Sequence, residues 1–148
     1  MLFGRDRRII HSLLIVEDEP LVAFDNEHFL TQAGYRVAGT VASLADAQAL
    51  LNRAPVDLVV ADVNLAGRRD GIEVARLAAQ RNIAVLFVTA ACPADARHLA
   101  LGCLAKPYSQ RDLHDAIEAA DAILRGAKPG RLPHGFTLFD RALDGDAA

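Results

Sequence analysis

Four charged side chains in this sequence each follow a short apolar run. They are Glu17, Asp18, Asp62 and Lys106. In an open parallel sheet, the loops after the carboxyl ends of the strands converge where the strand order reverses. We therefore expect these side chains to share one pocket, together with Thr89, which follows a further apolar run.

Carboxylates gathered in this way repel one another. Two unit charges about 4 Å apart interact by roughly 4 kcal/mol at an effective protein dielectric constant near 20. A divalent cation removes the conflict. Mg²⁺ suits it, because this hard ion takes carboxylate and carbonyl oxygens while keeping several waters that an incoming phosphoryl oxygen can replace. Lys106 adds a second positive charge.

The elements that must position these residues alternate along the chain. Five apolar runs predict strands, and the segments between them have helical periodicity. The strands are expected at 13–16, 35–38, 58–61, 84–88 and 103–105, and the helices at 21–33, 44–53, 72–80, 93–101 (short) and 113–124. Several runs are apolar without alternation, as in parallel sheets covered by helices on both faces. This order predicts an α/β fold with a doubly wound, five-stranded parallel sheet.

The composition of the whole chain argues against several classes of protein. The 148 residues are 52% hydrophobic and carry a formal net charge of −3, which suits one packed domain without the broad basic field that nucleic acid requires. The apolar run at 13–16 is too short for a signal peptide or a membrane span. Cys92 and Cys103 lack metal-ligand spacing, so we expect reduced thiols in the cytoplasm, with a disulfide as the less favoured alternative.

The chain divides into three segments by composition. We expect an N-terminal extension at 1–11, a domain at 12–125 and a C-terminal tail at 126–148. The tail is too short for a helix-turn-helix output module with its own core. Two alternatives stay open for its apolar residues Phe136, Leu138 and Phe139. They belong either to a disordered end or to a segment that docks on the domain or on a partner, because they are costly to leave in water.

The motifs after the predicted strands resemble the receiver domain of two-component response regulators. They are Ile15-Val-Glu-Asp-Glu-Pro20, Val60-Ala-Asp62, Phe87-Val-Thr89 and Lys106-Pro-Tyr108. The resemblance covers about 12–125 and implies a flavodoxin-like receiver fold with the strand order 2-1-3-4-5. It also implies that the protein is a signalling protein that accepts a phosphoryl group, and that it is not an enzyme. Its expected cofactor is Mg²⁺.

The resemblance gives each charged residue a role. Asp62 would be the phosphoacceptor and also a metal ligand, while Glu17 and Asp18 would hold Mg²⁺ and Asn64 would add its backbone carbonyl. Asp62 would attack a phosphohistidine in line, and Mg²⁺ and Lys106 would neutralise charge on the equatorial oxygens. Glu19 is expected to cap the first helix or to face solvent.

The resemblance also implies a switch. Thr89 would hydrogen-bond a phosphoryl oxygen and pull its loop inward. Lys106 and Pro107 resemble the family's Lys-Pro step, whose peptide bond is cis, a geometry that only proline makes cheap. Cys103 stands where the family usually has a Tyr or Phe. The usual coupling between the threonine and an aromatic side chain is therefore not expected. We interpret Cys103 as a small buried hydrophobe in preference to a redox sensor.

Two departures resemble an atypical group of single-domain receivers found beside stress-response sensor kinases. Lys106 comes only 17 positions after Thr89, which leaves room for a short fourth helix. The fourth strand ends Phe87-Val-Thr-Ala90, where that group often has Phe-Ala-Thr-Gly. We infer that the short segment 93–101 is mobile and orders on phosphorylation.

The expected partners follow from the resemblance. They are a sensor histidine kinase, a histidine phosphotransfer protein, or both, with a downstream protein target and a homodimer left open. The signal would leave through the face of the fourth helix, fifth strand and fifth helix. No nucleic acid, membrane or attached output domain is expected, and output, phosphate sink and relay stay open.

Three other functions are compatible with parts of this sequence. One is a Mg²⁺-dependent phosphohydrolase of the haloacid dehalogenase class, which needs a second Asp two positions after the nucleophile, where this chain has Asn64. Another is a protein-binding module that works without phosphorylation. A nucleotide site is weaker, because no Gly-rich loop follows the first strand. Arg68, Arg69 and the five histidines are expected to be surface residues without a ligand pattern.

Overall fold

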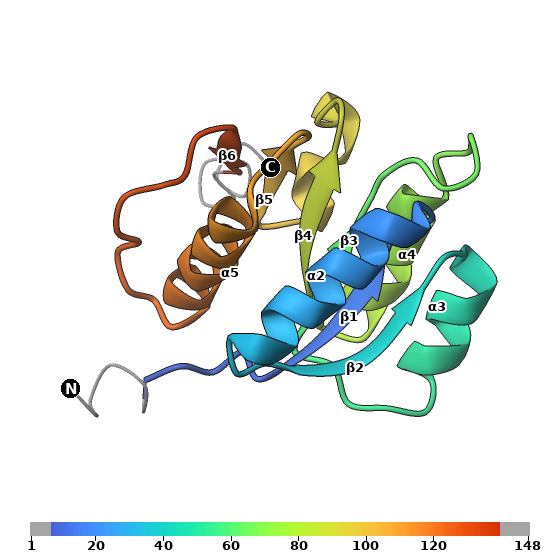
Figure 1. Ribbon diagram of the computed structural model, residues 1–148, viewed down its shortest axis with the longest axis horizontal. Coiled ribbons are helices and arrows are strands. Elements are labelled where there is room, and N and C mark those ends of the chain that lie inside the picture. The colour runs from blue at the N-terminus through green and yellow to red at the C-terminus, as the bar shows by residue number, and fades with distance from the viewer. Residues whose placement is uncertain (1–6, 140–148) are drawn as a thin grey trace.

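A six-stranded sheet forms the centre of the computed structural model, which describes residues 7–139 (Figure 1). Its elements in chain order are β1 (Ser12–Val16), α2 (Pro20–Gln32), β2 (Arg36–Val41), α3 (Leu44–Leu51), β3 (Leu58–Ala61), α4 (Asp70–Gln80), β4 (Ala84–Thr89), the 3₁₀ helix η1 (Ala94–Leu99), β5 (Gly102–Ala105), α5 (Gln110–Leu124) and β6 (Phe136–Leu138). No helix within the described range is long and apolar enough to cross a membrane.

The first five strands are parallel and lie in the order β2-β1-β3-β4-β5, which confirms the predicted order. β1, β3, β4 and β5 bury side chains on both faces, whereas the edge strand β2 has only partly buried or exposed residues. In β1, Leu14 and Val16 pack in a core with α3 and α4, whereas Leu13 and Ile15 pack in a second core with α2 and α5. The uninterrupted apolar runs of the sequence therefore arise because helices cover both faces of the sheet, as proposed.

Local signals fix the ends of the helices. The hydroxyls of Ser43 and Ser109 accept from the backbone N–H groups of Asp46 and Asp112, which caps α3 and α5. Leu113, Ile117 and Ala120 form a buried stripe on α5 that seals one face of the sheet. Leu124 continues this stripe but is 40% exposed, because it is the last residue of the helix.

The fourth helix is short, as the spacing predicted. It is a 3₁₀ helix of six residues, and Ala96 inside it departs from helical geometry. Such helices have poorer hydrogen bonds than α-helices and rarely extend further. The mobility expected for this segment stays a prediction.

The sheet has one strand more than predicted. β6 pairs antiparallel with β5, and Phe139 beyond it is only 5% exposed. Residues 136–139 of the tail thus dock on the domain, the second of the two alternatives. A Cβ on Gly102 would lie 2.7 Å from the Phe136 ring, so the glycine permits this close approach. The sequence prediction missed the strand because three residues carry too little periodicity to identify one.

Candidate functional site

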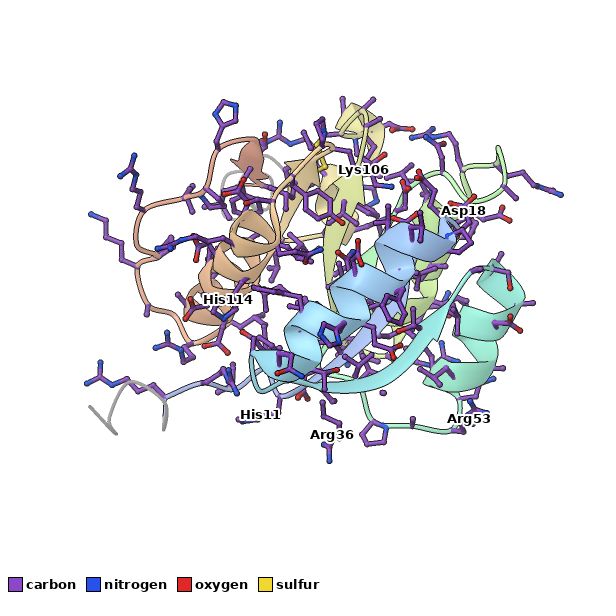
Figure 2. All side chains as sticks on the ribbon, viewed as in Figure 1. His11, Asp18, Arg36, Arg53, Lys106 and His114 are labelled. Atoms are coloured by element: carbon purple, nitrogen blue, oxygen red, sulfur yellow. A yellow bond between two sulfur atoms is a disulfide. The ribbon has the colours of Figure 1, made fainter. Side chains whose placement is uncertain are left out.

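The candidate site lies at the carboxyl ends of the parallel strands. Figure 2 shows Asp18 and Lys106 at the edge of the molecule toward which the strand arrows point, and His11, Arg36 and Arg53 at the opposite edge. This edge is where the sequence predicted a convergence of charged residues.

Three carboxylates meet at this edge. Glu17, Asp18 and Asp62 each offer one oxygen within 4.8 Å of the others. Glu17 is 2% exposed and Asp62 is 6% exposed, so two of the three have little access to water. The backbone N–H of Asp62 donates to the Val16 carbonyl at 3.0 Å, which fixes the end of β3 against β1. Such a group of hard oxygen donors has the chemistry of an Mg²⁺ site.

Lys106 reaches into the same cluster from the end of β5. Its Nζ lies 2.8 Å from Asp62 Oδ2 and 2.8 Å from Glu17 Oε1. Burial alone would lower the pKa of the Lys106 ammonium, but the hydrogen bonds to Asp62 and Glu17 outweigh it and raise this pKa. The ammonium therefore stays charged. Glu19 occupies the N-cap position of α2, as expected, but makes no capping bond with its side chain; its exposed carboxylate lies 3.6 Å from the ammonium.

Glu17 is the carboxylate whose ionisation the site opposes. Burial raises its pKa, and this effect exceeds the lowering by Lys106 and by the backbone N–H of Glu19. The negative charge of Asp62 raises the pKa further. A cation at the cluster would favour the ionised form of Glu17 and so offset both effects on its pKa.

Two backbone N–H groups orient the other carboxylates. Asp18 Oδ2 accepts from the N–H of Ala66 at 2.8 Å, and Asp62 Oδ1 accepts from the N–H of Asn64 at 3.2 Å. The loop after β3 thus lies against the cluster, and it brings the Asn64 backbone next to the predicted acceptor. Ala66 has a φ of 53°, which an L-residue rarely adopts.

Gly71 was not singled out from the sequence, yet it fits this loop against α4. A Cβ there would lie 1.9 Å from the backbone oxygen of Asp62, so any other residue would push the loop away. No clear signal in the sequence identifies it, because Gly71 precedes the predicted helix 72–80 and only the structure places it in the first turn of α4.

Thr89 lies at the end of β4, fully buried. Its hydroxyl oxygen has no hydrogen-bond partner within the described part of the chain, which is unfavourable by about 1–3 kcal/mol for a buried polar group. Its carbonyl accepts from the N–H of Lys106 at 2.8 Å. The peptide bond between Lys106 and Pro107 is cis, the geometry that the resemblance implied.

Three further polar residues tie the loop after β5 to α2. Buried Asn26 donates through Nδ2 to the Tyr108 hydroxyl at 2.9 Å, and Gln110 Nε2 donates to Asn26 Oδ1 at 3.1 Å. Asn26 was missed because a polar residue in a helix carries no signal of burial. These bonds hold in place the loop that presents Lys106.

The two cysteines correct one prediction. Cys92 and Cys103 form a disulfide, with their Cα atoms 6.0 Å apart, so the expectation of reduced thiols was wrong. Cys103 is buried, as expected, but it is not a free hydrophobe. The chain returns through η1 into β5 and so brings together two residues that are 11 positions apart. Their spacing in the sequence does not reveal this.

Two further groups of titratable side chains lie outside the cluster. Arg69 pairs with Asp95 at 2.9 Å, and both side chains are exposed, where an ion pair contributes little. His114, Asp115 and Glu118 share one face of α5 with ligand atoms within 4.8 Å, a grouping that the sequence prediction did not anticipate. His114 also lies edge-on to the Tyr35 ring, so it packs as an aromatic residue.

The fold and site match known proteins. The family model of the response regulator receiver domain matches residues 13–118. The transcriptional regulatory protein PdtaR of Mycobacterium tuberculosis is 36% identical over 121 residues, which are 78% of this chain and 58% of that relative. The chain thus spans little more than half the length of this curated relative.

Two solved receiver domains have a similar structure. The receiver domain of a modulated diguanylate cyclase from Desulfovibrio desulfuricans G20 is 31% identical, with a TM-score of 0.68, and the match covers 80% of this chain and 98% of that one. The receiver domain of the response regulator PhyR from Erythrobacter litoralis is 27% identical, with a TM-score of 0.63, and the match covers 75% and 89%.

Proposed function

Because the chain belongs to the response-regulator receiver family, we propose that it accepts a phosphoryl group on Asp62 from a phosphohistidine. The donor would be a sensor histidine kinase or a histidine phosphotransfer protein. The observation that carries this proposal is the position of Lys106, whose ammonium lies 2.8 Å from the carboxylates of both Asp62 and Glu17.

The chemistry follows from the groups around Asp62. One carboxylate oxygen of Asp62 attacks the phosphorus, and the bond from phosphorus to the histidine nitrogen breaks. Lys106 then balances charge on the phosphoryl oxygens. Mg²⁺ would be held by Glu17, Asp18, Asp62 and the Asn64 carbonyl, and when bound it supplies the further positive charge that phosphoryl transfer needs. The three carboxylates fit this ion, because they already lie within 4.8 Å of one another.

Thr89 would sense the new group. Its buried hydroxyl lacks a hydrogen-bond partner within the described residues, and a phosphoryl oxygen on Asp62 would provide one. The gain of this hydrogen bond would draw the loop after β4 toward the site. Cys103 has no aromatic side chain of the kind that usually accompanies this movement, and its sulfur is bonded to Cys92.

The donor would dock beside α2. Leu21 and Phe24 are 80% and 67% exposed there, which is unusual for large apolar side chains. A groove of about 520 Å³ between α2 and the loop after β5 is lined by residues that include Asn26, Lys106 and Tyr108. An amphipathic helix carrying the phosphohistidine could lay its apolar side on this surface.

The signal would leave through η1, β5 and α5, with β6 as part of the same surface. β6 occupies the edge of β5, so a partner meets the tail strand there in place of an open sheet edge. This partner would be a downstream target, a second copy of the chain or a further phosphotransfer protein.

Intact mass after incubation with acetyl phosphate and Mg²⁺ tests the proposal. We expect one added phosphoryl group on the wild-type chain and none on Asp62→Asn. Asp46→Asn, an exposed residue of α3, is the matched control and should be phosphorylated normally. Transfer from candidate phosphorylated kinases then identifies the donor. Unmodified wild-type protein in both assays would reject the proposed function.

A further inference from the structure

The Cys92–Cys103 disulfide joins the loop after β4 to the adjacent strand β5. Cys92 lies three residues beyond Thr89 and is exposed, whereas Cys103 is fully buried in the sheet beside Phe87. The bond, drawn in yellow in Figure 2, therefore has one end that a small molecule can approach and one end in the core.

The surroundings of Cys103 extend this link beyond the loop. Cys103 pairs with Thr137 of β6 and shares a core cluster with Ala96 of η1 and with Phe139. The Arg97 guanidinium lies over the Phe139 ring, 5.0 Å from its centre. The disulfide thus fastens the Thr89 loop to the point where η1, β5 and β6 meet.

We propose that Cys92 and Cys103 form a reversible thiol–disulfide site that controls how readily the Asp62 pocket takes a phosphoryl group. The reaction partner is a low-molecular-weight thiol and its disulfide, of the glutathione class. The control of the pocket rests on the function proposed above, whereas the redox reaction of the two cysteines does not.

The exchange balances in two steps. In oxidation, the Cys92 thiolate attacks the small disulfide, a mixed disulfide forms and one small thiolate leaves. The Cys103 thiolate then attacks the Cys92 sulfur, the protein disulfide forms and the second small thiolate leaves. The protein thiols lose two electrons and two protons, and the small disulfide becomes two thiols. Reduction runs the same steps in reverse and begins at Cys92, because Cys92 is exposed and Cys103 is buried.

The position of the bond determines the sign of the coupling. Thr89 must carry its loop toward a phosphoryl group on Asp62, but the closed disulfide keeps Cys92 next to β5. The oxidised chain should therefore bind a phosphoryl group less well than the reduced chain. Coupling is reciprocal, so a phosphoryl mimic should shift the cysteines toward the dithiol by the same factor. Couplings between two sites commonly fall between about 5-fold and 150-fold, and we expect about 10-fold here.

Beryllofluoride with Mg²⁺ serves as the phosphoryl mimic in the test. The full chain is equilibrated in glutathione buffers of graded ratio, and the free thiols are counted by alkylation and intact mass. Calorimetry then gives the affinity for beryllofluoride of the fully oxidised and fully reduced chains. We expect the reduced chain to bind about 10-fold more tightly, and saturating beryllofluoride to shift the glutathione midpoint toward the dithiol.

Two variants separate the coupling from effects on folding. Cys92→Ser leaves the buried cysteine in place and should bind beryllofluoride like the reduced wild type in every glutathione buffer. Ala91→Ser, at the adjacent exposed position, should keep the redox dependence. Equal affinities of the two wild-type forms, or tighter binding by the oxidised form, would overturn the coupling.

The two proposals can fail separately. If neither redox form binds beryllofluoride or reacts with acetyl phosphate, the proposed function is rejected and the coupling with it. The thiol count still decides whether the cysteines exchange reversibly. If the chain is phosphorylated but its thiol count does not change with the glutathione ratio, the redox site is rejected and the proposed function stands.

Discussion

Glu17 and Asp121 are both buried carboxylates, but they lie at opposite ends of the sheet and have opposite surroundings. Glu17 follows the last residue of β1, whereas Asp121 contacts Ile9 and Ile10, just before β1 begins. Glu17 is 2% exposed and Asp121 is 4% exposed. Burial is therefore the same, and the difference between the two residues comes from their neighbours.

Hydrogen-bond donors surround Asp121. The backbone N–H groups of Ile9 and Ile10 and the guanidinium of Arg125 each lie 2.8 Å from its oxygens. Burial would raise the pKa of Asp121, but these hydrogen bonds outweigh it and lower this pKa. Its stabilising contribution is complete above the ordinary pKa of 3.8 and is lost as the pH falls through the lower folded value.

Glu17 has two other carboxylates beside it. Burial raises its pKa above the ordinary value of 4.5, and Asp62 adds to the rise. Its contribution to stability is complete below pH 4.5 and is lost as the pH rises through the higher folded value. At one end of the sheet, the ionised carboxylate of Asp121 stabilises the fold. At the other end, burial and the charge of Asp62 disfavour ionisation of Glu17. Such disfavoured charges are typical of functional sites.

The largest expected effect is at the Asp121 end. Asp121→Ala leaves the N–H groups of Ile9 and Ile10 without their acceptor and Arg125 without its partner. We expect the free energy of unfolding at neutral pH to fall by about 3 kcal/mol. Urea unfolding followed by circular dichroism measures this change.

Glu118→Ala is the control for this variant, because Glu118 is an exposed residue of the same helix. We expect its free energy of unfolding to change by less than about 0.5 kcal/mol. A cost for Asp121→Ala as small as that of the control would contradict a structural role for Asp121.

The contrast between the two ends also explains how far the sequence could predict the molecule. Uninterrupted apolar runs indicate buried parallel strands, and Glu17, Asp62 and Lys106 could be grouped because each follows such a run. Asp121 could not be singled out, since the two backbone N–H groups that it accepts from lie 111 and 112 positions away. Nothing in its immediate sequence distinguishes it from a solvated helix residue.

The same limit applies to the disulfide and the tail strand. Cys92 meets Cys103 only because a six-residue 3₁₀ helix turns the chain back into β5. β6 forms only because Gly102 leaves space for Phe136. Both features depend on tertiary packing at single positions, and packing of this kind leaves no periodic pattern in a sequence.

A second, smaller loss of stability is expected at the end of the sheet that carries the candidate site, when the Lys106 ammonium is removed. Lys106→Met leaves Glu17 and Asp62 without the cation that lies 2.8 Å from both. We expect the free energy of unfolding to fall by about 2 kcal/mol without divalent ions, because a buried carboxylate without a partner is unfavourable. Urea unfolding with and without Mg²⁺ measures the loss and its recovery.

The response to Mg²⁺ is what distinguishes the two ends. It should stabilise Lys106→Met more than wild type and leave the deficit of Asp121→Ala unchanged. Lys128→Met, at an exposed position, is the control and should behave as wild type. If Mg²⁺ stabilised wild type and Lys106→Met equally, the lysine and the metal ion would not share the same carboxylates.

The smallest effect comes from removing the charge of Glu17 while keeping its shape. Because the folded pKa of Glu17 is raised, the ionised form destabilises the metal-free chain. Glu17→Gln should therefore become more stable relative to wild type as the pH rises from 4.5 toward neutrality, by less than about 1 kcal/mol in total. Adding Mg²⁺ should reverse the order, since only wild type gains a ligand. Urea unfolding at several pH values measures this, with Glu118→Gln as the exposed control. A constant difference across this pH range would mean that Glu17 is paired as fully as Asp121, and the contrast between the two ends of the sheet would fail.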